Sequence, residues 1–65
     1  MATVETETVN AHAASALCGS HDVWELHAED ITYGFFGGIL DDVMREYPDA
    51  DAFFVFADGT CDVWL

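Results

Sequence analysis

The feature that most constrains this chain is Asp58-Gly59, which stands between two short apolar runs. The runs are AFFVFA before the pair and TCDVWL after it. Asp-Gly between two such runs is the strongest short-range hairpin signal, because a type I′ turn needs positive φ at both central positions. The pair therefore predicts two antiparallel strands joined by a two-residue loop.

A two-residue loop also fixes which residues of the hairpin lie opposite one another. The predicted partners are Phe56 with Cys61, Val55 with Asp62, Phe54 with Val63, and Phe53 with Trp64. Because side chains alternate between the faces of a strand, this register places Phe53, Val55 and Trp64 on one face. The other face then carries the remaining apolar side chains, which are Phe54, Phe56, Cys61, Val63 and Leu65.

Another strand is predicted in the segment HDVWELHAED. Trp24, Leu26 and Ala28 recur at a period of two, with mostly polar residues between them, which is the pattern of a half-buried strand. The acidic pair Glu29-Asp30 ends the pattern.

Residues 31–47 change to apolar spacings of three and four, with acidic side chains and Arg45 on the opposite side. This spacing predicts an amphipathic helix. Pro48 ends it, because the residue before a proline is disfavoured in the α region. Its start stays open between Ile31 and Phe35, because glycines weaken a helix interior and three of them lie here: Gly34, Gly37 and Gly38.

The N-terminal part of the chain is less definite. Residues 1–9 are polar and are expected to be flexible, although the alternation in TVETETV also suits an edge strand. In residues 10–19, Asn10 suits a helix N-cap and Gly19 suits the position after a helix, so a short helix or turn is expected. Residues 10–65 are therefore expected to form one domain.

These elements predict a small α+β domain with the order strand–helix–strand–strand and an optional short helix before it. One helix can cover only one face of the sheet, and the face with Phe54, Phe56 and Val63 is assigned to it. The other face then exposes Phe53, Val55 and Trp64, with Trp24 from the preceding strand as a further candidate interaction residue.

An exposed apolar face and a short chain together favour self-association. A domain of this size is marginally stable alone, and a large exposed apolar patch is a liability. We therefore expect a homo-oligomer, most simply a two-fold dimer joined sheet to sheet or edge to edge. The alternative is that the N-terminal segment folds over the exposed face.

The charge of the chain is strongly one-sided, with 13 acidic residues, no lysine, and Arg45 as the one basic side chain apart from histidine. Because 52% of the residues are apolar, this acidity belongs to a folding sequence and not to a disordered tail. At about 1 M salt the Debye length is about 3 Å, so like charges barely repel and hydrated carboxylates keep a surface soluble. The composition predicts a cytoplasmic protein of a halophile.

The same composition argues against two classes of partner. Nucleic-acid binding needs lysine or arginine against phosphate, and one arginine cannot supply it. The N-terminus lacks the basic and apolar regions of a signal peptide, and no apolar run approaches the ~20 residues of a membrane span. We therefore expect neither a nucleic-acid nor a membrane partner.

Cysteine and histidine give the one candidate metal site. Cys18-x-x-His21 has a ligand spacing that zinc can use, with Cys61 or His12 completing the set. The competing interpretation is one buried cysteine, one cysteine in a turn and surface histidines, because Cys61 is predicted to face the core. A Cys18–Cys61 disulfide is also open, although a cytoplasmic chain keeps its thiols reduced.

No motif for catalysis or nucleotide binding accompanies these residues. Cys18 with His21 lacks a glycine motif for an oxyanion hole, and GFFGG matches no phosphate-binding loop. The chain is therefore expected to be a non-enzymatic protein–protein interaction module without a cofactor, self-associating or docking another protein through the aromatic sheet face. The alternative is a small zinc protein using Cys18, His21 and Cys61.

Overall fold

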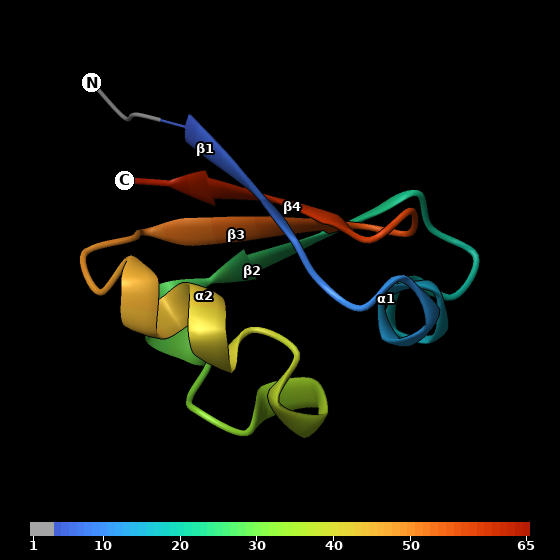
Figure 1. Cartoon of the computed structure of the whole chain (residues 1–65), viewed down its shortest axis with the longest axis horizontal. Helices are drawn as coiled ribbons and strands as arrows, with labels where there is room; N and C mark the ends of the chain where they lie inside the picture. Colours follow the sequence, from blue (N-terminus) through green and yellow to red (C-terminus); the bar gives the residue numbers. More distant parts are fainter. Residues whose placement is uncertain (1–3) are drawn as a thin grey trace.

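Four antiparallel strands form one sheet in the computed structural model, which describes residues 4–65 (Figure 1). Their order across the sheet is β1-β4-β3-β2, and their bounds are Val4–Thr8 for β1, Val23–His27 for β2, Ala52–Phe56 for β3 and Thr60–Trp64 for β4. The α-helices are α1 (Ala11–Cys18) and α2 (Asp41–Glu46), and two 3-10 turns are η1 (Ala28–Asp30) and η2 (Phe35–Gly38). This architecture confirms the predicted small α+β domain that ends in a hairpin.

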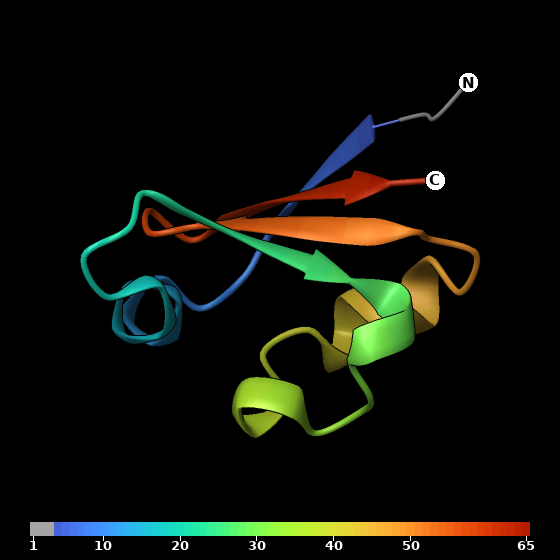
Figure 2. The ribbon, with the colours of Figure 1, turned by 180° about the vertical axis from the view of Figure 1, so that it is seen from behind.

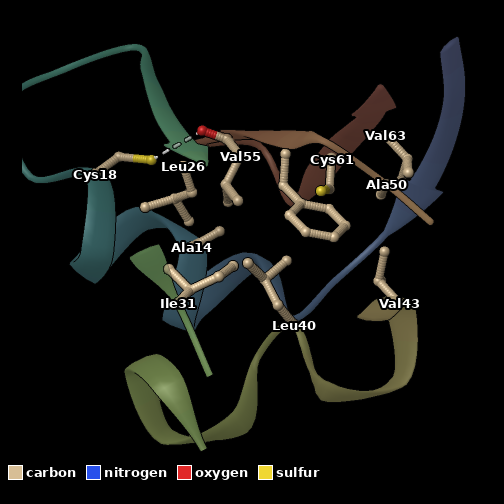
Figure 3. Packing of buried hydrophobic residues seen from close by; sticks show 11 residues of the cluster. Ala14, Cys18, Leu26, Ile31, Leu40, Val43, Ala50, Val55, Cys61 and Val63 are labelled. Carbon is tan, nitrogen blue, oxygen red and sulfur yellow. Dashed lines mark hydrogen bonds between the residues drawn. The ribbon is translucent and has the colours of Figure 1, made fainter. Parts of the chain in front are cut away.

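All the helical segments lie on one side of the sheet, and no described segment covers the other side (Figures 1 and 2). The core fills the space between the sheet and these segments (Figure 3). Its buried residues come from every strand but β1 and from the segments packed beneath the sheet: Ala14, Cys18, Leu26, Ile31, Leu40, Val43, Ala50, Phe53, Val55, Cys61 and Val63.

The hairpin has a three-residue loop in place of the predicted two-residue one. β3 ends at Phe56 and β4 begins at Thr60, and the Gly59 N–H donates to the Phe56 carbonyl at 3.1 Å. Gly59 has φ +94°, which suits the three-residue hairpin loop whose last residue has positive φ. The Asp58 carboxylate accepts hydrogen bonds from the Thr60 hydroxyl (2.7 Å) and N–H (2.9 Å), and these bonds lower the pKa of Asp58.

The additional loop residue shifts the strand register by one, so the predicted register is wrong. Val55 lies opposite Cys61, and Phe53 lies opposite Val63. Because the side-chain period of a strand is two, a one-residue shift moves every side chain of one strand to the other face. Phe53 and Val55 are therefore core residues, 1% and 0% exposed, and not part of the uncovered face.

The first helix and the β2 strand agree with the sequence prediction. The Asn10 carboxamide oxygen accepts a hydrogen bond from the Ala13 N–H at 2.9 Å and caps α1, and Gly19 follows the helix with φ +61°. In β2, Leu26 is buried and Trp24 half-buried on the helix side, while Val23 points to the other side.

The single helix predicted within residues 31–47 is mostly wrong, because only Asp41–Glu46 is α-helical. The chain before it turns repeatedly through left-handed conformations, at Gly34, Phe36, Gly37 and Gly38. Ile31, Leu40 and Val43 are nevertheless buried, so the apolar spacing marked core residues without marking one continuous helix.

The N-terminal segment adopts the edge strand that the alternation in TVETETV left open. Val4–Thr8 forms β1, and Val4 lies opposite Trp64 of β4. The Tyr47 hydroxyl at the end of α2 donates a 2.6 Å hydrogen bond to the Glu7 carboxylate. This bond and the neighbouring negative charge raise the pKa of Tyr47 to about 12. Residues 1–3 of the predicted flexible segment lie outside the described residues.

Candidate interaction surface

The uncovered side of the sheet, here called the open face, is a candidate surface for an interaction. It carries an aromatic pair, Phe54 and Trp64, whose ring centroids lie 5.7 Å apart. Trp64 and Val23 are each 40% exposed. The strand register assigns the following side chains to this face: Val4, Thr6, Thr8, Val23, Glu25, His27, Ala52, Phe54, Phe56, Thr60, Asp62 and Trp64.

The open face carries two carboxylates, and both have polar partners. Only two of the 13 acidic residues, Glu25 and Asp62, point to it from the strands. The Glu25 carboxylate lies 2.8 Å from His27 Nε2, and the Asp62 carboxylate accepts a 3.0 Å hydrogen bond from the Thr6 hydroxyl. The remaining carboxylates therefore lie away from this face or around its rim.

The predicted interaction residues are divided by the register shift. Trp64 lies on the open face, whereas Phe53 and Val55 are buried in the core. Trp24 is half-buried on the helix side of the sheet, where its ring packs edge-on against Phe36 at a centroid distance of 4.8 Å.

Sequence reasoning missed Phe54, Phe56 and Val23 as members of the exposed face. The signal that could have found them is the loop length, because Asp-Gly also suits the last two positions of a three-residue hairpin loop. With that loop the alternation in AFFVFA assigns Phe54 and Phe56 to the uncovered side.

The two cysteines are free, and both are buried. The Cys18 thiol donates to the Val55 carbonyl, with Sγ and O 3.3 Å apart (Figure 3). Burial, with the nearby Asp62 and Glu7 charges, raises the pKa of the Cys61 thiol to about 12. Zinc binding and nucleophilic attack both need the thiolate, and burial of Cys61 strongly disfavours it.

The candidate zinc ligands are not brought together. His12 and His21 are exposed, while Cys61 lies in the core. Among residues 4–65, no group of three or more histidine, cysteine or acidic side chains is placed to hold a metal ion. The zinc hypothesis therefore has no supporting geometry.

Comparison with known proteins adds no assignment, because no family model, curated protein or solved structure matches this chain. In the part of the chain that the structure describes, no helix has the length and apolar character to cross a bilayer.

Proposed function

We propose that this protein is a small, non-enzymatic interaction module from the cytoplasm of a halophile, and that two copies associate through their open faces. The observation that supports this proposal is an entire sheet face that no described segment covers and that carries the Phe54–Trp64 pair. Burying a large aromatic side chain contributes about 2–3 kcal/mol, which matters for a 65-residue domain of marginal stability.

Paired carboxylates and apolar side chains together make a second copy a suitable occupant of this face. Two molecules of net charge −12 repel one another, and that repulsion is smallest where the approaching surfaces hold few carboxylates. From the described strands, Glu25 and Asp62 are the acidic residues on the open face, and both already have hydrogen-bonding partners. A two-fold arrangement, which brings the same patch of each copy together, also requires no second surface.

Molar mass in concentrated salt tests this proposal. Light scattering in about 2 M KCl, where the Debye length is only a few Å, should give the mass of a dimer for the wild-type protein. Trp64→Asp should shift the protein towards the monomer, because it replaces an exposed aromatic side chain of the interface with a charge beside Phe54.

Tyr33→Asp is the matched control, since Tyr33 is an aromatic residue that is 56% exposed and belongs to no strand. It adds the same charge and should leave the dimer intact. A monomeric wild-type protein at millimolar concentration, or equal dissociation by both substitutions, would show that the open face does not join two copies.

A further inference from the structure

Strand β2 is an edge of the sheet whose outer backbone groups have no strand beside them within residues 4–65. The Asp22 carbonyl accepts from the Ala57 N–H at 3.2 Å, and the Ala28 N–H donates to the Asp51 carbonyl at 2.9 Å, so even-numbered residues bond to β3. In an antiparallel pair the alternate residues point their N–H and C=O groups the other way. The backbone groups of Val23, Glu25 and His27 therefore face outward along the free edge.

A shallow, open apolar groove of about 440 Å³ lies beside this edge on the helix side of the sheet. Figure 2 shows β2 with α1 and η2 beneath it on either side. The groove is lined by small and apolar side chains from three elements, which are Ala13, Ala16 and Leu17 of α1, Trp24 of β2 and Phe36 of η2.

Phe36 is held in an unusual backbone conformation at this groove. Its φ is +51°, and it is the one residue other than glycine with positive φ in the described part of the chain. Strained residues of this kind persist where the surroundings hold them, and they cluster at sites that bind ligands. The Phe36 ring packs against Trp24 and is 36% exposed, so it forms a wall of the groove and not part of the core.

From these observations we infer that β2 binds an extended peptide segment as a fifth strand. The peptide's backbone pairs with the outward groups of Val23, Glu25 and His27, and its alternate apolar side chains enter the groove between Trp24, Phe36 and Leu17. This is the strand-addition mode of recognition, in which backbone hydrogen bonds give affinity and pockets for alternate side chains give specificity.

The residues between the apolar ones in this peptide are basic. They fall on the side of β2 that carries the Glu25 carboxylate, in a molecule with a net charge of −12. An added strand places side chains of every second residue opposite those of its neighbour, so lysine or arginine there is the complementary choice.

A second copy of this chain suits this edge poorly. Its own β2 would have to fill the groove with Trp24 and Leu26, but Leu26 is 6% exposed and Trp24 packs against Phe36 within its own molecule. The groove lies on the opposite side of the sheet from the open face, and only the peptide's basic side chains reach the margin of that face, beside Glu25.

Fluorescence titration with a synthetic peptide tests the inference. The probe is the capped heptapeptide Lys-Phe-Lys-Val-Lys-Phe-Lys, titrated in about 0.5 M and about 2 M KCl so that screening of the charge contribution is visible. In a Trp64→Phe background, Trp24 is the only tryptophan and reports from the groove. The expected result is saturable binding that changes Trp24 emission in both buffers.

Two controls separate strand addition from charge attraction. The same peptide with N-methyl groups on alternate backbone nitrogens should bind at least about tenfold more weakly, since it cannot form the ladder of hydrogen bonds. Glu25→Pro should bind the peptide about tenfold more weakly than Glu25→Gln, because proline removes an N–H that points outward and donates nothing to β3. Proline is tolerated in edge strands, so the fold should persist.

Phe36→Asn tests the groove separately, because asparagine tolerates the left-handed conformation and removes the ring. It should weaken binding of the phenylalanine-containing probe without loss of the circular dichroism spectrum. Equal binding of the methylated peptide would overturn the inference even if a protein variant failed to fold. A dimer that Glu25→Pro dissociates and Glu25→Gln leaves intact would also overturn it, since the edge backbone would then belong to a second copy.

Discussion

At the scale of single residues, Gly59 is the position with the least freedom to change. It sits where the hairpin loop meets the junction of β1 and α1, and the Val9 N–H donates to its carbonyl at 2.7 Å. A Cβ on Gly59 would lie 2.9 Å from the Ala11 Cα and 3.2 Å from the Val9 carbonyl oxygen. The φ of +94° is in addition one that side chains rarely allow.

We expect Gly59→Ala to lower the free energy of unfolding by about 2 kcal/mol or more, from left-handed strain together with the backbone clash. Gly19→Ala is the matched control, because Gly19 also has positive φ (+61°) but no atom lies within 4 Å of the place that a Cβ would take. Its cost should be smaller than that of Gly59→Ala, because it carries only the backbone strain of about 1–2 kcal/mol. Denaturant titration in concentrated KCl measures both, and equal losses would mean that the close approach to Ala11 is not rigid.

The residue scale also explains why the predicted register is wrong. Asp58-Gly59 identifies the hairpin correctly, but the dipeptide fits both a two-residue and a three-residue loop. The choice is made by contacts that local pattern does not contain, namely the fit of Gly59 against Ala11 and Val9. One residue of loop length then exchanges the buried and exposed aromatic residues of β3.

At the scale of elements, β1 depends on a side-chain hydrogen bond from a distant part of the chain. Tyr47 donates to Glu7 from the end of α2, while β1 otherwise contacts mainly β4. Because the folded state raises the Tyr47 pKa from 10.0 to about 12, the contribution of this bond is complete below pH 10 and is lost as pH rises from about 10 to 12.

Tyr47→Phe should therefore loosen β1 without unfolding the rest of the sheet. Hydrogen exchange of the β1 amides at neutral pH should become faster, while protection in β2 and β3 stays close to wild type. The wild type should lose stability between pH 10 and 12, and this loss should be absent in the variant. Tyr33→Phe is the control, since Tyr33 is exposed. If Tyr47→Phe and the wild type lose stability equally at alkaline pH, the Tyr47–Glu7 hydrogen bond does not hold β1 in place.

The elements differ in how well the sequence predicts them, and the difference has a physical cause. α1 and β2 are recognisable because local signals agree: the Asn10 cap, the Gly19 stop, and the period-two pattern around Leu26. Residues 31–40 are not, because Ile31 and Leu40 are buried at spacings that also suit a helix, while glycines between them let the chain turn instead. The apolar spacing predicts that these residues are buried, but it does not predict the backbone conformation that buries them.

At the scale of the whole molecule, the net charge of −12 should make stability depend on salt. Repulsion among carboxylates opposes the compact state, and salt screens it over shorter distances as concentration rises. We expect the fold to loosen below roughly 0.5 M KCl and to be restored by added KCl. Circular dichroism measured during a KCl titration checks this expectation.

A variant that neutralises three exposed carboxylates, Glu29→Gln with Asp30→Asn and Asp49→Asn, should depend less on salt than the wild type. None of these three side chains takes part in a hydrogen bond with another described side chain, so their loss should leave packing unchanged. A wild-type spectrum that is unchanged down to millimolar salt would refute salt adaptation as the reason for the acidic surface.

The pairing of β1 with β4 has a consequence for the order in which the molecule assembles. Val4 and Trp64 are opposite each other in the sheet but 60 positions apart in the sequence. The hairpin of β3 and β4 closes a loop of a few residues, whereas the β1 pairing closes almost the entire chain, at a higher entropic cost. We therefore expect β1 to dock last, onto a three-stranded intermediate whose β4 edge is briefly free. A short linker that joins β1 to the end of β4 should then speed the slowest step of folding.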